Sequence, residues 1–444
     1  MHDVLDVRDV VADEWRQLDS SGYDVGDLRS SVLDAVAAND SIRLRTLLVE
    51  LAQAPRRADW PYVEPSQPEE ILAALDEPLR GEAWGGTEPE LEDRLRGAWL
   101  ARCVGCVMGK PVEGLDRERI ERYLRAADAW PQRGYIPLLE PLPEGIERLH
   151  SSAPRSAAGR FDAVPRDDDT DYTVLGLHLL ETYGRELSVE HIALEWLDRL
   201  PFTQTFTAER AAYRNLIEGV TPERAAVVRN PYREWIGALI RADAFGYACP
   251  GDACASVKLA IQDARLSHVA NGIYGEMWAA ALVSSAFTAT DIRDALLVAR
   301  SWLPASTRMR EAQGLVLELH AQEASWEQLV ERLDALVGHY DWVHTVNNAA
   351  AIAASLLWGE GDLVQSVGLV VALGWDTDSD GATVGSVLGA MHGSAVVPTA
   401  LSAPFNNQLR SAIRDYDRCS ISELAQRTLV LALDGARRTT DLDA

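Results

Sequence analysis

The chain has 444 residues, enough for one large domain or for two or three smaller units. Hydrophobic residues make up 47% of it, which is typical of a globular protein. The formal net charge is −26, and a surface this acidic repels phosphate backbones and anionic lipids. The composition therefore argues against direct nucleic-acid binding and against a role at a membrane surface.

The first residues, MHDVLDVRDVVADEW, are acidic and amphipathic, unlike the basic start and apolar run of a signal peptide. No segment approaches the roughly 18 uninterrupted apolar residues expected of a membrane-spanning helix. We therefore expect a cytoplasmic location and no contact with a membrane.

Residues 1–86 are predicted to form a small helical extension and a linker. Amphipathic spacing as far as about residue 53, as in SSVLDAVAANDSIRLRTLLVELAQ, indicates short helices. The stretches APRRADWPYVEPSQPEE and EPLRGEAWGGTEPE are rich in Pro, Trp and Gly and are typical of a linker. Oligomerisation or solubility suits this part better than chemistry, and residues 87–444 are predicted to form the main domain.

A long helix is predicted from Thr87, which forms a capping box with Glu90 ahead of LEDRLRGAWLARCVGCVMG. Each glycine inside a helix costs about 0.5–1 kcal/mol of stability relative to alanine. A helix that keeps several glycines in spite of this cost indicates close approach of another backbone or of a ligand. The helix must end by Pro111, which leaves Glu113 just beyond its C-terminus. Its small residues share one face because they recur at every fourth position: Gly97, Ala101, Gly105 and Gly109.

The rest of the chain is alanine-rich and predicts an all-α fold. Residues 130–165 are rich in Pro, Gly and Ser and predict a long loop. Helical spacing recurs from there to about residue 435, as in EHIALEWLDRL and VNNAAAIAASLLWG, and strand-like alternation is scarce. We expect one compact helical domain.

Five cysteines, an odd number, argue against a disulfide framework. Cys103 and Cys106 form a C-x-x-C, and Cys249 and Cys254 form a looser pair. A zinc site made from both pairs is one hypothesis, but buried free thiols are the expected outcome.

Two acidic clusters stand directly before helices and suggest a metal site. One acid at such a position caps amide groups and meets the positive end of the helix dipole. Three or four exceed that need and repel one another, which a hard cation such as Mg²⁺, Mn²⁺ or Ca²⁺ would relieve. The first cluster is Asp167, Asp168, Asp169 and Asp171, and the second is Asp376, Asp378 and Asp380.

The second cluster also begins like an EF-hand loop, and that hypothesis is rejected. The twelfth position counted from Asp376 is Val387, where an EF-hand needs a bidentate glutamate. A solvated acidic loop would explain either cluster alone. Both together, each opening a helix with small residues nearby, favour a shared metal site. The glycine-lined helices would supply the close packing that brings the two clusters together.

Four segments resemble motifs of the ADP-ribosylglycohydrolase family, over about residues 91–400. GAWLARCVGCVMGKPVEG is similar to the family's opening G-x-x-x-G-D-A-x-G-x-P-x-E helix, and RDDDTDYTVL is similar to its T-D-D-T motif. DARLSH is similar to its central Ser/Thr-His element, and LGWDTDSDGATVGSVLGAMHG is similar to its G-G-D-T-D-T segment. The two aspartate motifs carry most of the specificity.

The resemblance implies a compact orthogonal helical bundle in which two divalent ions, usually Mg²⁺, bind a ribose where its glycosidic bond is cleaved. Mn²⁺ or Ca²⁺ are substitutes. The resemblance also implies that Glu113 lies near the substrate and acts in acid/base catalysis or in gating of the site. The metal ligands carried over by position are Asp167, Asp168, Asp169, Asp376, Asp378 and Ser379. The residues that the resemblance implies as substrate contacts are His268, Asn230, Gly237 and Trp375.

Several positions depart from the family pattern. Asp167 stands where the family has a threonine, and Cys106 stands where it usually has an aspartate. Trp375 replaces a glycine and is expected to narrow the pocket. The glycine-rich substrate loop is faint in RNPYREWIGALIRADAFG, and Pro231 cannot donate the amide that a pyrophosphate cradle uses.

Three functions remain open on the sequence. The first is a Mg²⁺-dependent hydrolase that removes ADP-ribose from a protein or another acceptor. The second is a related hydrolase of a different riboside, motivated by the altered loop. The third is a non-catalytic relative that binds a ligand or has a structural role.

Overall fold

The computed structural model describes residues 6–442, with side chains to residue 434, and it is all-α as predicted. The extension and linker carry α1 (Val7–Ser20), α2 (Arg29–Ala37), α3 (Ser41–Leu51) and α4 (Pro68–Ala73). Next come α5 (Glu88–Gly109), α6 (Arg117–Ala126), α7 (Ala153–Ser156), α8 (Asp168–Tyr183), α9 (Val189–Arg199), α10 (Thr207–Ile217), α11 (Pro222–Ala225), α12 (Asp243–Tyr247) and α13 (Ala253–Ala264). The remainder is α14 (Asn271–Ala286), α15 (Ile292–Ser301), α16 (Arg308–Ala321), α17 (Trp326–Val337), α18 (Thr345–Trp358), α19 (Leu363–Leu373), α20 (Thr377–His392), α21 (Thr399–Ser402), α22 (Ile421–Leu442) and the strand pair β1 (Gln408–Leu409) and β2 (Cys419–Ser420).

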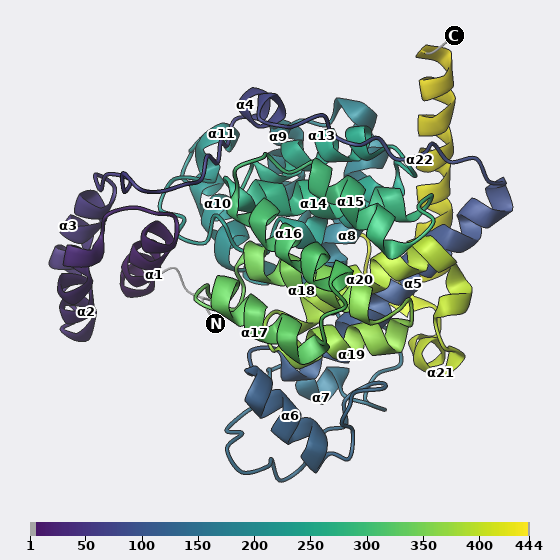
Figure 1. The fold of residues 1–444 in the computed structure, drawn as a ribbon, viewed down its shortest axis with the longest axis horizontal. Coiled ribbons are helices and arrows are strands. Elements are labelled where there is room, and N and C mark those ends of the chain that lie inside the picture. The colour runs from purple at the N-terminus through teal and green to yellow at the C-terminus, as the bar shows by residue number, and fades with distance from the viewer. Residues whose placement is uncertain (1–5, 443–444) are drawn as a thin grey trace.

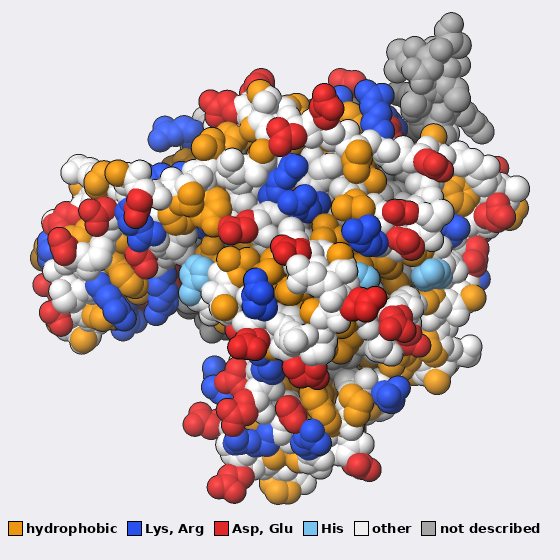
Figure 2. Space-filling model, in the orientation of Figure 1, with side chains coloured by type: hydrophobic (Ala, Val, Ile, Leu, Met, Phe, Trp, Pro, Cys, Tyr) orange, Lys and Arg blue, Asp and Glu red, His pale blue; other side chains and the backbone are white. Residues whose placement is uncertain are grey.

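The N-terminal helices form a small lobe beside the main body. Helices α1, α2 and α3 share a hydrophobic cluster of their own, which includes Val11, Leu18 and Leu44. Figure 1 shows this lobe at one side, and the linker running from it over the main body to the start of α5. Figure 2 shows the lobe projecting from the body, with acidic and basic side chains interspersed over this face. The predicted short helices are confirmed.

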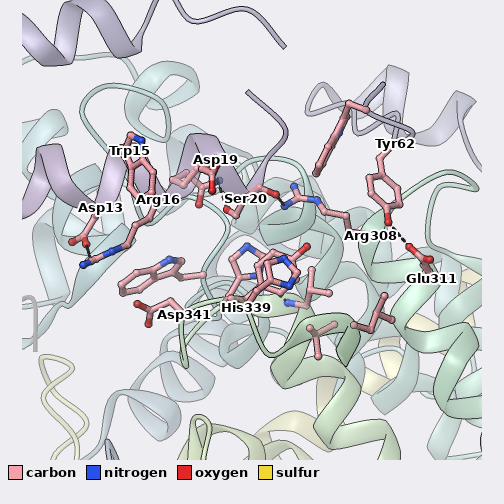
Figure 3. A pocket seen from close by; sticks show the side chains of 18 of the residues that line it. Asp13, Trp15, Arg16, Asp19, Ser20, Tyr62, Arg308, Glu311, His339 and Asp341 are labelled. Carbon is pink, nitrogen blue, oxygen red and sulfur yellow. Dashed lines mark hydrogen bonds and ion pairs between the residues drawn. The ribbon is translucent and has the colours of Figure 1, made fainter. Parts of the chain in front are cut away.

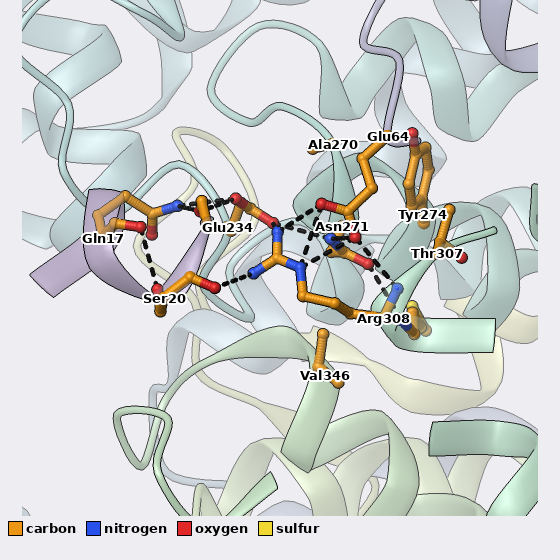
Figure 4. A network of polar contacts seen from close by, with 12 residues as sticks. Gln17, Ser20, Glu64, Glu234, Ala270, Asn271, Tyr274, Thr307, Arg308 and Val346 are labelled. Carbon is orange, nitrogen blue, oxygen red and sulfur yellow. Dashed lines mark hydrogen bonds and ion pairs between the residues drawn. The ribbon is translucent and has the colours of Figure 1, made fainter. Parts of the chain in front are cut away.

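A buried polar network fastens the lobe and the linker to the main body (Figure 4). Arg308 is 3% exposed, and its Nη2 lies 2.8 Å from Glu64 Oε2 in the linker and 2.5 Å from Glu234 Oε2. From α1, Gln17 Nε2 donates to Glu234 Oε1 at 2.7 Å. Asn271 Nδ2 donates to both carboxylates, at 2.8 and 2.9 Å. Arg308, Glu64 and Glu234 come from three separate segments of the chain, and the positive charge of the arginine offsets the negative charges of the two acids.

The centre of the main body is an antiparallel contact between α5 and α20 at the distance of backbone against backbone. A Cβ placed on Gly105 would lie 1.9 Å from Gly381 O, and one on Gly385 would lie 2.1 Å from Ala101 O. Only glycine leaves room for such contact. The close approach predicted from the four-residue spacing is confirmed, and the approaching backbone is that of the second glycine-rich helix.

This packing determines where the acidic clusters lie. A Cβ on Gly109 would lie 2.1 Å from Thr377 O, and Thr377 Oγ1 donates to Gly109 O at 3.0 Å. The C-terminus of α5 therefore meets the N-terminus of α20. The buried Arg102 of α5 donates Nη2 to Asp169 O at 2.7 Å, which holds the first turn of α8 against the same place.

Predicted helix limits in α5 are confirmed. Thr87 Oγ1 accepts from Glu90 N, Glu90 Oε2 accepts from Thr87 N at 2.7 Å, and the helix ends at Gly109, before Pro111. Residues 127–167 form the predicted long loop, interrupted only by α7 within this stretch. No helix among the described residues has the length and apolar character needed to cross a membrane.

Candidate metal and substrate site

The acidic clusters meet at the junction of α5, α8 and α20. Asp167 is the N-cap of α8, where its carboxylate accepts from Asp169 N at 3.2 Å. Asp376 is the N-cap of α20, and Asp378 lies in the first turn. Glu113 follows the short 3₁₀ helix Lys110–Val112 at the end of α5. Two helix N-termini and one helix C-terminus thus place their carboxylates together.

Two sets of potential ligand atoms occur at this junction, and Asp378 belongs to both. Within each set, the ligand atoms lie within 4.8 Å of one another. The first set comprises Cys106, Asp167, Asp169 and Asp378. The second set comprises Glu113, Asp376 and Asp378. We call these the α8 set and the α20 set.

The donor atoms of this cluster suit a hard divalent cation. All of them except the Cys106 sulfur are carboxylate oxygens, which favour Mg²⁺, Mn²⁺ or Ca²⁺. Asp169 Oδ1 and Asp378 Oδ1 are buried and have no hydrogen-bond partner among the described residues. A buried carboxylate oxygen without a partner is costly, and a bound cation removes that cost. The residues present therefore fit a metal ion.

Burial and mutual repulsion disfavour the charged forms of four of these carboxyls, those of Glu113, Asp168, Asp169 and Asp376. Burial, with a contribution from Asp167, raises the pKa of Asp168 to about 7. Burial and the nearby Asp378 raise the pKa of Glu113 to about 8 and hold the pKa values of Asp169 and Asp376 well above their usual range. Perturbed carboxyls gathered in one buried place are typical of a functional site.

Two residues of this site were missed in the sequence. Lys110 Nζ lies 2.6 Å from Asp378 Oδ2, 2.7 Å from Asp167 Oδ2 and 2.8 Å from Glu113 Oε2. His150, from the long loop, places Nδ1 3.3 Å from Glu113 Oε2. Lys110 was visible inside the motif GKPVEG, three residues before the acid that it contacts. His150 carries no local signal.

A small cavity of about 100 Å³ opens on the cluster. Lys110, Glu113 and His150 form one part of its wall, and Trp235 and Gly237 form another. The predicted site residues that line it are Glu113, Asp168, Gly237, Asp376, Asp378 and Ser379. Asp169 lies behind this wall, 1% exposed, and Asp167 faces the neighbouring cavity described next.

A larger cavity of about 870 Å³ adjoins the small one and is lined by arginines. The two cavities share Lys110, His150, Asp168 and Phe206 as wall residues. Arg155 and Arg160 are exposed there, and neither has an ion-pair partner among the side chains described. The arginines that line it are Arg155, Arg160, Arg166, Arg210 and Arg410. Asp162, Asp167 and Asp168 also line the cavity, so its basic side chains outnumber its acids. In a chain of net charge −26, such a local excess of cations suits an anion.

Three residues predicted to contact substrate are not among the residues lining these two cavities. Asn230 is fully buried and donates Nδ2 to Ser267 O at 2.8 Å. His268 is 1% exposed, with Nδ1 2.8 Å from Ser267 Oγ, and burial and Arg241 hold its pKa well below the usual value. Trp375 is 9% exposed and packs in the main hydrophobic core. Their contact with substrate stays a prediction.

Behind Gly237 lies a buried ion-pair group around Arg241, and sequence reasoning missed its acids, Glu209, Asp263 and Glu276. Arg241 Nη1 lies 2.6 Å from Glu209 Oε1, Arg241 Nε also pairs with Asp263, and Glu276 lies 3.6 Å from Nη2. Burial raises the pKa of Glu209 to about 7 although Arg241 lowers it. Glu209 also lines the small cavity, so one member of this group faces the site. Glu209 was not predicted because, in the sequence, it looks like any acid on the surface of a helix.

A third cavity, of about 640 Å³, lies between the N-terminal lobe and the main body (Figure 3). Trp15, Arg16 and Asp19 reach it from α1, and His339 and Asp341 reach it from the loop after α17. The carboxylates of the two ligand sets do not line it. Trp235 is part of the wall of both this cavity and the small one.

The cysteines are free thiols, as expected. Cys103, Cys106 and Cys249 are buried, and Cys254 and Cys419 are partly exposed. Burial and nearby carboxylates hold the pKa of Cys106 well above its usual value, so it is a neutral thiol beside the α8 set. Among the described residues, Cys106 is the only cysteine within a potential metal-ligand set.

Together, the fold and the site define an all-α protein that gathers carboxylates at two helix N-termini, beside an arginine-lined cavity. The family model described as ADP-ribosylglycohydrolase matches residues 87–439, and the chain belongs to this family. It is therefore a glycosidase-type hydrolase, of a metal-dependent family that acts on ADP-ribosylated substrates.

One solved structure, described as an ADP-ribosylglycohydrolase-related protein complex, is 19% identical to this chain with a TM-score of 0.44. The match covers 78% of this chain and 99% of the other. No curated protein matches the chain.

Proposed function

We propose that this protein is a Mg²⁺-dependent hydrolase that removes ADP-ribose from an ADP-ribosylated protein or small molecule, with residues 87–444 as its catalytic domain. The observation that carries the proposal is the junction of the two cavities. A carboxylate cluster suited to a cation and an arginine-lined cavity suited to an anion share Lys110, His150 and Asp168. ADP-ribose needs this combination because its ribose would lie at the cation and its diphosphate beside it.

In the proposed site, the aspartates of the two ligand sets, with Asp168 and Ser379 beside them, would hold Mg²⁺. When bound, the ion would orient the ribose hydroxyls and polarise a water for attack on the anomeric carbon. The residues that would hold it are Asp167, Asp168, Asp169, Asp376, Asp378 and Ser379.

Glu113 is the proposed acid/base residue. It lies at the wall of the small cavity, where burial and the nearby Asp378 raise its pKa to about 8. Such a carboxyl exchanges a proton readily with an attacking water or a departing group. Lys110 and His150, 2.8 and 3.3 Å from Glu113 Oε2, hold the carboxyl toward the cavity.

Arg155 and Arg160 are the proposed diphosphate contacts. Of the residues that resemble the family's glycine-rich loop, Asn230 is fully buried, and Gly237 lies at the wall of the small cavity against the Glu209 carboxylate. The arginine-lined cavity therefore supplies the anion contacts that backbone amides would otherwise make.

The proposal is tested by incubating the purified full chain and Mg²⁺ with arginine-, serine- and other-linked ADP-ribosyl substrates. Release of free ADP-ribose, abolished by EDTA, is the expected result. A chain that holds Mg²⁺ and releases ADP-ribose from none of them contradicts the proposal.

A second candidate is hydrolysis of another riboside. The altered substrate loop favours it, because Pro231 cannot donate the amide hydrogen bond that a pyrophosphate cradle uses. Release of a free base or sugar from nucleosides lacking a diphosphate would favour this candidate. Strict dependence on the diphosphate would exclude it.

A further inference from the structure

Lys110 has the surroundings of a bound cation. Its side chain is 10% exposed, and its ammonium lies 2.6–2.8 Å from three carboxylates. These acids come from three different elements: Asp378 from α20, Asp167 from the N-cap of α8, and Glu113 from the end of α5. Three carboxylates around a compact positive charge form the ligand arrangement that a hard metal ion would otherwise have.

The ammonium lies between the two ligand sets. It contacts Asp167 of the α8 set, Glu113 of the α20 set, and Asp378, which belongs to both. One oxygen of each of these acids is therefore engaged by the lysine. Asp378 Oδ1 and Asp169 Oδ1 still have no hydrogen-bond partner among the described residues. The donors that remain suit one further cation, and a second divalent ion would be repelled by the lysine.

Lysine is rare in this chain, and one of its two lysines lies in the acidic cluster. The chain has 42 Lys and Arg residues, and only Lys110 and Lys258 are lysines. Lys258 is exposed on α13, whereas Lys110 is buried in the acidic cluster. An ammonium is a compact point charge and a guanidinium is a planar fork, so only lysine reproduces the shape of a metal ion.

The departure from the family pattern at Asp167 complements the lysine. Asp167 stands where the resemblance places a ligand threonine, and its carboxylate is one of the three partners of Lys110. The added negative charge of Asp167 thus lies 2.7 Å from the positive charge of Lys110. The two residues form an internal ion pair within the metal-binding cluster.

We infer that the Lys110 ammonium fills one of the two cation positions of this cluster, so that each chain takes one divalent ion instead of two. The inference rests on the proposed metal centre and is independent of which riboside is cleaved. The centre would then combine one exchangeable metal ion with one cation supplied by the protein itself.

The test is the number of Mn²⁺ ions bound per chain, measured by equilibrium dialysis of EDTA-treated full-length protein. We expect one ion for the wild type and two for Lys110→Met, whose side chain is similar in length but uncharged. Electron paramagnetic resonance should show coupling between the two Mn²⁺ ions only in Lys110→Met. The matched control is Lys258→Met, which removes the only other lysine and should bind one ion.

Two ions in the wild type overturn the inference, and this result does not depend on whether Lys110→Met folds. An equal count in the wild type and in a folded Lys110→Met, checked by circular dichroism, also overturns it. No Mn²⁺ in any variant contradicts the metal centre itself. Failure to cleave ADP-ribosyl substrates, with one ion in the wild type and two in the variant, contradicts only the proposed substrate.

Discussion

Replacing Gly105 by alanine tests whether the α5–α20 contact builds the site. The new Cβ would lie 1.9 Å from Gly381 O, whereas ordinary contact begins at 3.4 Å. The helices must therefore separate locally by about 1.5 Å. Overpacking of this kind costs about 1–3 kcal/mol or more, and a gap wider than 1 Å removes over half of the dispersion energy across it. We expect a loss of about 4 kcal/mol in the free energy of unfolding.

The same separation should reach the acidic cluster. Lys110 follows α5 directly, and its 2.6 Å contact with Asp378 joins the two helices at their ends. Gly105→Ala should therefore weaken Mn²⁺ binding as well as stability.

The assay is urea unfolding followed by circular dichroism, with Mn²⁺ binding measured in parallel. The control is Gly314→Ala in α16, where the new Cβ meets only the far end of the flexible Arg300 side chain at 3.0 Å. That helix-interior substitution should be neutral or stabilising by up to about 1 kcal/mol. If Gly105→Ala were as stable as Gly314→Ala, the reasoning about backbone contact would be refuted.

Three further predictions concern the site. Glu113→Gln should keep Mn²⁺ binding and lower the rate of glycosidic cleavage by about 100-fold or more, and an unchanged rate would remove Glu113 from the mechanism. Arg155→Ala with Arg160→Ala should weaken ADP-ribose binding by roughly 100-fold or more and leave ribose binding unchanged, since each charge-assisted hydrogen bond is worth about 1.5–3 kcal/mol and two would be lost. The control is Arg133→Ala, at an exposed arginine outside the cavity. Glu209 holds a proton in the folded protein up to about pH 7 that the unfolded chain releases near 4.5, so stability should fall as pH rises between these values, by up to about 1.4 kcal/mol per pH unit. Glu209→Gln should flatten this slope in urea titrations at pH 5, 6 and 7, and an equally steep slope in the variant would contradict the assignment.

Local and periodic signals predicted much of the fold. The capping box at Thr87 and Glu90 depends on residues three apart, and the glycine face of α5 depends on a repeat of four, so both were visible in the sequence. The partner helix could be inferred because it carries the same repeat. Both aspartate motifs were likewise placed correctly at helix N-termini.

Contacts between distant segments were not visible. Lys110 meets Asp167 and Asp378 only once three helices have packed, and nothing near residue 110 specifies those partners. The same holds for Arg308, which joins Glu64 of the linker to Glu234 of the main body. Ion pairs across such sequence separations leave no periodic trace, so one sequence alone does not reveal them.

One aspartate of the first cluster has a structural role instead. Asp171 Oδ1 accepts from Ser411 Oγ at 2.6 Å and from Ala412 N at 2.9 Å, and its Oδ2 accepts from Arg166 at 2.7 Å. It therefore fastens the C-terminal segment to α8. A run of acids in the sequence did not distinguish it from its neighbours, because Ser411 and Ala412 lie some 240 residues away.

The most direct test of the central claim is a calorimetric titration of ADP-ribose into Mg²⁺-loaded protein, with ribose and AMP as comparisons. The account predicts that ADP-ribose binds more tightly than either comparison and that EDTA abolishes its binding. No binding of ADP-ribose by protein that demonstrably holds Mg²⁺ would contradict it.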